Sequence, residues 1–185
     1  MSAPANRQHL HEIAMRLFRQ HGYDSVSIAQ IAAEAGVSRM TFFRHFSSKE
    51  SVLVEDLFDP AIAVAIAAQP SSAHPLARVV RGLVAALSEP EAARELSSGG
   101  FRDRIQLVAA TPSLRGAVWA SSANTERAIR EALTSSGTPE EQARAAAGAA
   151  MGAATTILLN WASGPGTVGA AEALTTGLTS LVGPS

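Results

Sequence analysis

The chain has 185 residues, of which 46% are hydrophobic and 17% charged, and its net charge is -1 at pH 7. This composition allows a buried core and excludes a chain that is disordered throughout. There is no cysteine, which excludes disulfides, thiolate metal sites and cysteine nucleophiles and fits a reducing compartment. Because the first ten residues lack the apolar stretch of a secretion signal, we expect a cytoplasmic protein.

Charge is distributed unevenly along the chain. Residues 1–53 carry six basic and four acidic side chains, whereas residues 54–185 carry nine basic and twelve acidic ones. Only the N-terminal part has an excess of positive charge, so it is the better candidate to bind a polyanion. An excess this small is also common on an ordinary solvated surface.

Helical spacing recurs throughout the chain and no strand-like alternation of any length is present, which predicts an all-α fold. The first helix should end near Gly22. Its apolar residues recur at intervals of three and four and so share one face, namely Leu10, Ile13, Ala14, Leu17 and Phe18.

Three helix-start signals follow in quick succession. Ser27 and Gln30 have the spacing of a capping box, in which each side chain binds a backbone N–H group of the other residue. Ser38 is the expected N-cap of the next helix. Ser47 and Glu50 form a third expected capping box, and it predicts a longer amphipathic helix that carries Val52, Leu53 and Leu57.

Short helices capped in this way are typical of a helix-turn-helix, whose second helix enters the DNA major groove. Residues 28–35 would be the first helix, Gly36 the turn, and 39–45 the recognition helix. The expected core residues are Ile31, Ala32, Val37, Phe42 and Phe46. The side chains left exposed or half-exposed are those of Arg39, Met40, Thr41, Phe43, Arg44 and His45.

Beyond Pro60 the chain is rich in alanine and broken by proline and glycine. We predict two domains, a helix-turn-helix DNA-binding domain at 1–53 and a helical bundle at 54–185. The helices expected in the bundle are at about 76–88, 91–97, 101–110, 113–135, 139–162 and 168–182.

The stretch from Ala14 to Leu57 resembles the tetracycline-repressor (TetR) family of transcriptional regulators. The resemblance is carried by Gly22-Tyr23, Ser27-Ile28, Ile31-Ala32, Ala35-Gly36-Val37-Ser38 and the run from Thr41 to Glu50. It implies a homodimer that binds a palindromic operator on double-stranded DNA, acts as a repressor and is released by a small apolar or amphipathic effector.

The resemblance also assigns roles to residues. It implies base contacts for Arg39 and Met40, and phosphate contacts for the positions of Ser27, Ser38, Thr41, Phe43, His45 and Lys49. Ser27 and Ser38 would cap helices in any case, and Arg39 could be only a solvated charge. Phe43 stands where the family often has a tyrosine, so one hydrogen bond of about 1.5–3 kcal/mol to a phosphate is absent.

Lys49 is the only lysine of the chain and follows directly on Ser48, at an expected helix start. A cation there opposes the helix dipole, so its placement needs another reason, and phosphate binding is a good one.

From Ala145 to Ala171 there are 27 consecutive uncharged residues, a length at which a membrane span must be considered. The stretch is mostly alanine and glycine and has little hydrophobic drive, so we expect no membrane contact. Small residues allow close helix packing. The resemblance implies that the helices at 139–162 and 168–182 form the dimer interface.

Catalytic motifs are absent, so no enzymatic activity and no cofactor are expected. His9 and His11 are two positions apart and face different sides of a helix, so no metal site is expected. The charged run Arg102-Asp103-Arg104 is interpreted as a solvated or interdomain cluster. A pocket in the bundle would be lined by Leu107, Trp119, Asn124, Met151, Thr155 and Asn160, each of which could equally be a plain core residue.

Two alternatives stay open. The helix-turn-helix could serve only for protein contact in a helical ligand-binding protein or enzyme. Alternatively, the bundle could dimerise a DNA-binding protein that has no effector.

Overall fold

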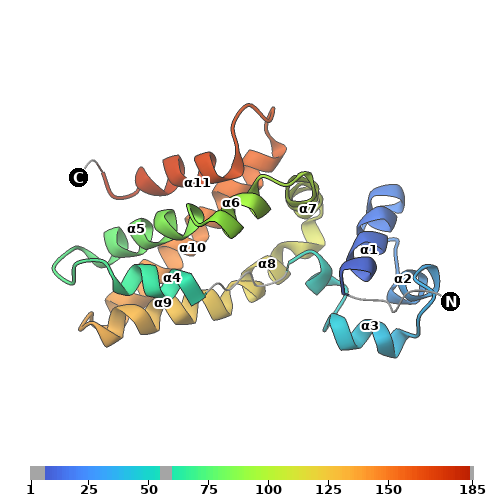
Figure 1. Ribbon diagram of the computed structural model, residues 1–185, viewed down its shortest axis with the longest axis horizontal. Helices are drawn as coiled ribbons and strands as arrows, with labels where there is room; N and C mark the ends of the chain where they lie inside the picture. Colours follow the sequence, from blue (N-terminus) through green and yellow to red (C-terminus); the bar gives the residue numbers. More distant parts are fainter. Residues whose placement is uncertain (1–6, 55–59, 184–185) are drawn as a thin grey trace. The chain divides into compact units, whose positions relative to one another are not determined.

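The computed structural model describes residues 7–54 and 60–183. Within these residues every regular element is a helix, which confirms the predicted all-α fold (Figure 1). The chain forms two compact units. The first contains residues 7–54 and also 107–121, and the second contains 60–106 and 122–183. The two-domain division predicted at residue 53 did not include the return of 107–121 to the N-terminal unit.

The N-terminal unit begins with α1 (Arg7–His21), α2 (Ile28–Glu34) and α3 (Arg39–His45). The predicted apolar face of α1 is buried, with Leu10 and Phe18 almost fully enclosed. Gly22 follows α1 with a φ of +81°, a left-handed conformation that glycine adopts without strain because it has no Cβ atom. This explains why α1 ends there.

The prediction of a longer helix after Ser47 is wrong within the described residues. Only a short 3-10 helix forms, η1 (Glu50–Val52), and Leu57 lies outside the described residues. Ser48 and Ser51 exchange hydrogen bonds between backbone N–H and hydroxyl groups, both at 3.2 Å. The Glu50 carboxylate accepts a hydrogen bond from the Tyr23 hydroxyl. The Glu50 carboxylate is therefore bonded to Tyr23, and the reciprocal pair at this turn is Ser48 with Ser51 in place of the expected Ser47 with Glu50.

The segment 107–121 contains the end of α7 (Gly99–Ala110), η2 (Pro112–Leu114) and α8 (Arg115–Ser121). The Ser113 hydroxyl donates to the Asp24 carboxylate at 2.8 Å, and Leu114 is fully buried. The single helix predicted over 113–135 is wrong, because α8 ends at Ser121. The Ser121 hydroxyl binds the Val118 carbonyl, a local bond of the kind that competes with the helical ladder.

The C-terminal unit is a bundle of α4 (Pro60–Ala67), α5 (Pro75–Leu87), α6 (Pro90–Leu96), α9 (Ala123–Ser135), α10 (Glu140–Ser163) and α11 (Ala170–Thr179). The long helix α10 packs against α5, α9 and α11, and α4 packs against α5 and α9 (Figure 1). The predicted helices at 76–88, 91–97, 139–162 and 168–182 agree with α5, α6, α10 and α11 to within three residues.

The core of the bundle combines large aliphatic side chains from α4, α5, α9 and α11 with alanines from α10. Each fully buried aliphatic side chain contributes about 1.5–3 kcal/mol to folding. The buried members are Ile66, Val79, Val80, Leu83, Ile129, Leu133, Ala143, Ala146, Ala147, Ala150 and Leu178.

One arginine is buried in this unit. Arg78 is 1% exposed, and its guanidinium group donates to Ser136 Oγ at 2.6 Å and to Thr138 Oγ1 at 3.1 Å. Both hydroxyls belong to the turn between α9 and α10. No acidic side chain among the described residues pairs with it, so the cation is held by the two hydroxyl dipoles, and its Nε has no hydrogen-bond partner.

The predicted charge cluster on α7 is packed within the C-terminal unit. The Arg102 guanidinium lies 4.2 Å from the centre of the Trp161 ring, and Arg104 pairs with Glu95 at 3.1 Å. The Phe101 and Trp161 rings are also in contact, at 6.0 Å between centroids. These cation–π and aromatic contacts attach α7 to the end of α10, so the cluster is more than a solvated charge run.

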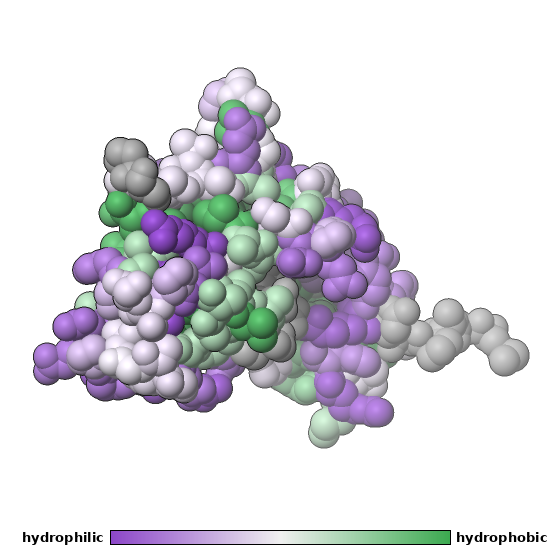
Figure 2. Space-filling view, turned by 60° about the vertical axis from the view of Figure 1, so that its left-hand side comes forward, coloured by the Kyte–Doolittle hydropathy of each residue, from purple (hydrophilic) through white to green (hydrophobic). Residues whose placement is uncertain are grey.

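Figure 2 shows one face of the molecule, where polar colours predominate and apolar residues form separate patches. The large apolar side chains that remain exposed in the described residues are Met40, Phe43, Val64, Trp119, Val168 and Leu181. Two of these six lie on α3, which is unusual for a helix of seven residues.

Candidate nucleic-acid interface

The core of the helix-turn-helix forms as the sequence predicts except at Val37, which is only half-buried. Ile31 and Ala32 on α2 and Phe42 on α3 are buried, and Phe46 closes the core behind α3. The rings of Phe42 and Phe46 lie 5.5 Å apart. The two rings pack together on the inward face of α3, and the opposite face of α3 is left towards solvent.

The turn between α2 and α3 depends on Gly36. Its φ is +67°, in the left-handed region that costs other residues energy. The N–H of the next residue, Val37, donates to the Ala32 carbonyl at 2.9 Å and closes the end of α2. The turn therefore sets the angle at which α3 leaves α2.

Both predicted N-caps are confirmed. Ser27 Oγ accepts from the Gln30 N–H at 3.2 Å, and Gln30 Oε1 accepts from the Ser27 N–H at 2.8 Å, which completes the capping box. Ser38 Oγ accepts from the Thr41 N–H at 3.0 Å and also contacts the Thr41 hydroxyl. The caps hold the first turns of α2 and α3 at defined positions.

The solvent face of α3 carries Arg39, Met40, Phe43 and Arg44. Met40 is 72% exposed and Phe43 is 44% exposed. Arg39 and Arg44 are exposed and form no ion pair or hydrogen bond with any described residue. Two free guanidinium groups and two exposed apolar side chains on one short helix can contact phosphates, base edges and thymine methyl groups.

An open groove lies beside α3 in the same unit. Its walls are the turn at 24–28 and the segment 47–50, and Phe43 lies at its edge. Ser27 and Ser48 supply hydroxyl groups to it. The carboxylates of Asp24 and Glu50 also line it, so the groove beside the recognition helix is polar and of mixed charge.

Lys49 lies in this groove but is already bonded within the protein. Its ammonium group donates to the carbonyls of Tyr23 and Val26, both at 3.0 Å, and lies 4.0 Å from the centre of the Tyr23 ring. These contacts supply a reason for its placement that the sequence did not reveal.

Tyr23 and Glu50 complete this arrangement, and sequence reasoning missed both. The Tyr23 hydroxyl donates to Glu50 Oε1 at 2.9 Å. Burial, the hydrogen bond to Glu50 and nearby carboxylates raise the pKa of Tyr23, so the phenol stays protonated. A backbone hydrogen bond lowers the pKa of Glu50 against the opposing effect of burial, and Ser48, Tyr23 and the charge of Lys49 lower it further.

Two family models match this chain. The model for bacterial regulatory proteins of the tetR family matches residues 11–55, and the model for the MftR C-terminal domain matches residues 73–184, which is more than half of the chain. The chain belongs to the TetR family. In this family the N-terminal helix-turn-helix is the DNA-binding domain, as the resemblance implied.

Individual relatives of this TetR-family chain are similar over short stretches. The transcriptional regulator AcrR of Shigella flexneri is 42% identical over 53 residues, which cover 29% of this chain and 25% of AcrR. TcmR of Streptomyces glaucescens is 38% identical over 72 residues, covering 38% and 32% of the two chains. The putative mycofactocin biosynthesis regulator MftR of Mycobacterium tuberculosis is 41% identical over 44 residues, covering 24% and 22%. The matches span only about a quarter to a third of these relatives.

Solved structures share the fold over nearly the whole length. The repressor FadR of Thermus thermophilus, solved with lauroyl-CoA, has a TM-score of 0.52 at 20% identity and covers 97% of both chains. NalD of Pseudomonas aeruginosa, a repressor of a multidrug efflux pump, has a TM-score of 0.56 at 19% identity and covers 93% of both chains. At these identities the likeness establishes the TetR fold of this chain and not its ligand.

The six residues predicted to line a TetR effector pocket do not come together within one unit. Leu107 and Trp119 belong to the N-terminal unit, where Trp119 is 60% exposed, and the other four belong to the C-terminal unit. Asn124 and Asn160 are exposed, and Asn124 accepts a hydrogen bond from Arg127. Of the four predicted residues in the C-terminal unit, only Met151 and Thr155 on α10 are half-buried, and Met151 packs against the core. Helical spacing could not reveal the break at Ser121 that separates the two groups.

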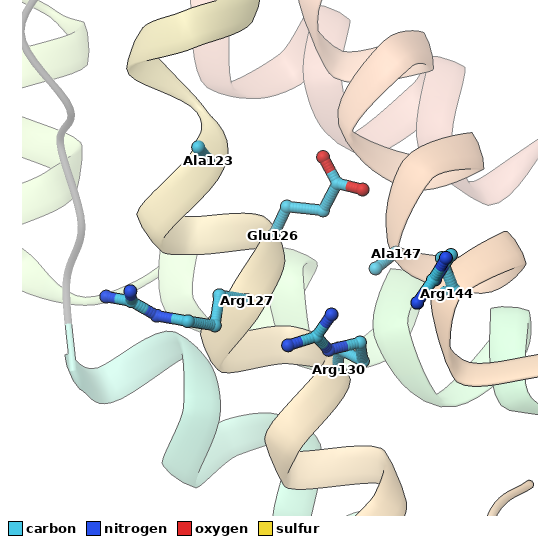
Figure 3. Close-up of a pocket in the computed structure, with 6 residues that line it drawn as sticks. All are labelled: Ala123, Glu126, Arg127, Arg130, Arg144 and Ala147. Atoms are coloured by element: carbon cyan, nitrogen blue, oxygen red, sulfur yellow. The ribbon is translucent and has the colours of Figure 1, made fainter. Parts of the chain in front are cut away.

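A charged cleft lies between α9 and α10 and is lined by Ala123, Glu126, Arg127, Arg130, Arg144 and Ala147 (Figure 3). Its volume of about 180 Å³ is below the range of about 300–1,000 Å³ that is usual for ligand sites. Arg130 and Arg144 share Glu140 as a partner, at 3.4 and 3.7 Å. The cleft is thus too small and too polar to be an apolar effector pocket.

No group of three or more His, Cys, Asp or Glu side chains that could hold a metal ion occurs in 7–54 or 60–183. Among these residues one helix, α10, is long and apolar enough to cross a membrane, and 22% of its apolar window is buried. In the C-terminal unit this helix packs against α5, α9 and α11.

Proposed function

We propose that this TetR-family protein is a cytoplasmic, non-enzymatic transcriptional repressor that binds a palindromic operator as a homodimer and is released by a small amphipathic effector. The observation that carries this proposal is the solvent face of α3, where Arg39 and Arg44 have no partner among the described residues and Met40 is largely exposed. Two unpaired guanidinium groups beside an exposed methionine on the second helix of a helix-turn-helix support contact of this face with DNA.

The proposal assigns parts to the residues of the interface. Arg39 and Met40 contact base edges, because they lie at the N-terminal end of the recognition helix. The other expected contacts are to the DNA backbone. They come from Ser27, Ser38, Thr41, Phe43, Arg44 and His45, whereas Lys49 has internal partners and a separate role.

DNA binding can be tested with a footprint on the region upstream of the protein's own gene. We expect a protected palindrome whose two halves are separated by one helical turn, about 34–36 Å, because two recognition helices of a dimer meet successive major grooves. Binding should weaken steeply as salt rises. A protein that uses its helix-turn-helix only for apolar protein contacts would show neither result.

Dimerisation is proposed to use α10 and α11. Ala149 is exposed on α10 and Gly152 is only half-buried, so a strip of small residues on this long helix is left uncovered in one protomer. Small side chains let a second helix approach closely. The resemblance to TetR regulators supports the same two helices.

Ala149→Glu tests this interface, because Ala149 is exposed and the protomer should still fold. A carboxylate buried between two copies without a partner costs several kcal/mol, roughly enough to dissociate the dimer. We expect a monomer in sedimentation and loss of operator binding. Ala85→Glu, at an exposed position on α5, is the matched control and should stay dimeric. A dimeric Ala149→Glu variant with full operator affinity would place the interface elsewhere.

The effector is proposed to bind in the C-terminal unit, next to Met151 and Thr155 on α10. Two FadR regulators with this fold were solved with lauroyl-CoA and stearoyl-CoA, which makes acyl-CoA thioesters a reasonable first class to screen. Binding would shift the population towards a form that does not fit the operator. If no ligand in such a screen releases the operator, the bundle serves only for dimerisation.

A further inference from the structure

Lys49 was expected to bind a DNA phosphate, but its ammonium group is bonded within the protein. A lysine ammonium has three N–H donors. In this protein two of them are used by the carbonyls of Tyr23 and Val26, and the face of the Tyr23 ring lies 4.0 Å from the nitrogen. Two carbonyl oxygens and one aromatic face surround the ammonium group, so at most one of its three donors is left for a DNA phosphate.

The two carbonyls belong to the turn that joins α1 to α2. Val26 is 2% exposed and directly precedes Ser27, the N-cap of α2. Lys49 therefore holds the start of α2 from a position more than twenty residues later in the chain. Since α2 carries α3 through the Gly36 turn, the position of the recognition helix depends on this contact.

Glu50 supports the same turn from the other side. Its carboxylate accepts the Tyr23 hydroxyl at 2.9 Å and thereby orients the ring that lies beside the Lys49 ammonium. The adjacent negative charge also compensates Lys49 within the protein. A lysine that is compensated in this way attracts a phosphate less strongly than the unpaired Arg39 and Arg44 do.

We infer that Lys49, Tyr23 and Glu50 form an internal tie that positions the start of α2, and that Lys49 contributes to DNA binding through this positioning and not as a phosphate ligand. The part of this inference that concerns DNA binding rests on the proposed function. The part that concerns the stability of the fold does not.

The test compares Lys49→Met with Arg44→Met, a matched loss of one cation from a residue without a partner. Thermal unfolding is measured without DNA, and binding to a short duplex of arbitrary sequence is measured over a range of salt concentrations. We expect Lys49→Met to lower Tm by a few degrees and to leave the salt slope unchanged. Arg44→Met should leave Tm unchanged and reduce the slope by about 0.9, the value for one phosphate contact.

Tyr23→Phe provides a milder second variant, because it removes only the hydroxyl that binds Glu50 and cannot remove a phosphate contact from a buried ring. It should lower Tm in the same direction as Lys49→Met, and the effects of the two changes should not add. A Lys49→Met variant with unchanged Tm and a slope reduced by about 0.9 would overturn the inference. If the wild-type protein binds no DNA, the proposed function fails, and the Tm measurements still decide whether the tie exists.

Discussion

The N-terminal and C-terminal units are both helical, but side chains of different size hold them together. In the N-terminal unit aromatic rings fill the core, with Phe18 and Tyr23 at 5.1 Å and Phe42 and Phe46 at 5.5 Å. Serine side chains cap α2 and α3 there. In the C-terminal unit the central helix α10 contributes alanines to the core, and α5, α9, α10 and α11 have no side-chain cap.

In the bundle, close packing of helices takes the place of aromatic cores and serine caps. A Cβ added at Gly82 on α5 would lie 2.9 Å from the Ile66 backbone, and one added at Gly177 on α11 would meet the Ile157 side chain. The comparison shows that the N-terminal unit is defined by local sequence signals. The bundle is defined by contacts between residues far apart in the chain, which spacing along the sequence does not reveal.

The largest effect is expected at Arg78 of the bundle. Arg78→Ala removes a buried side chain and both hydroxyl contacts to the α9–α10 turn, and it should lower the free energy of unfolding by about 3 kcal/mol. Arg78→Met keeps most of the volume and removes a buried charge that lacks a carboxylate partner, so it should cost less. Chemical denaturation measures both, with Arg94→Ala at an exposed position as the control. Equal stability of Arg78→Ala and the wild type would refute this role.

A substitution at the close contact between α5 and α4 should lower the free energy of unfolding by nearly as much. Gly82→Ala places a methyl group against the backbone of Ile66, which cannot move aside as a side chain end can, and overpacking of this kind costs about 1–3 kcal/mol. Gly116→Ala on α8 is the control, because nothing lies within 4 Å of its added Cβ and its φ is not positive. It should raise stability by a few tenths of a kcal/mol, roughly the helix-propensity gain. The same sign of change for both variants would contradict the packing argument.

In the N-terminal unit the positive φ of Gly36 should affect both stability and operator affinity. Gly36→Ala forces a residue with a Cβ to a φ of +67° and should cost about 1 kcal/mol, with a matching loss of operator affinity as α3 is displaced. Gly36→Asn should be better tolerated, since asparagine adopts this region more readily than alanine. Denaturation of both variants gives the order, and a more stable alanine variant would show that the turn is not strained.

The smallest effect is a pH dependence from Glu50. Its pKa is lowered in the folded protein, so its ionised form adds stability above the ordinary carboxylate pKa of 4.5. That stability is lost as the pH falls through the folded-state pKa. Glu50→Gln should therefore reduce stability at neutral pH and flatten its decline in acid. Tm measured from neutral to acidic pH would show this difference, and parallel curves for the two proteins would exclude it.

The fold, and the caps and the turn of the helix-turn-helix, could be predicted from the sequence because their causes are local. The capping box at Ser27, the cap at Ser38, the apolar face of α1 and the turn glycine all act between residues close in the chain. The tie of Lys49 to Tyr23 and Val26 could not be predicted, since it joins residues more than twenty positions apart. The sequence did not predict the break between α8 and α9 at Ser121, because the helical periodicity of the sequence continues across this position.

The residues proposed for an effector pocket could not be sorted into units from the sequence. Leu107 and Trp119 share the helical spacing of core residues with Met151 and Thr155, yet the two pairs fold into different units. Periodicity indicates that a residue faces some core and does not say which one. Assigning a pocket requires the packing of whole helices.

DNA reading by α3 is tested most directly by Arg39→Ala. The variant, the wild type and Arg94→Ala as control are titrated against the footprinted operator and against an arbitrary duplex at the same salt concentration. We predict that Arg39→Ala loses about 1–3 kcal/mol on the operator, with relaxed preference at one base pair in each half-site, and much less on arbitrary DNA. An equal loss on both duplexes would contradict base reading by Arg39, and unchanged affinity for both would contradict DNA binding through this face of α3.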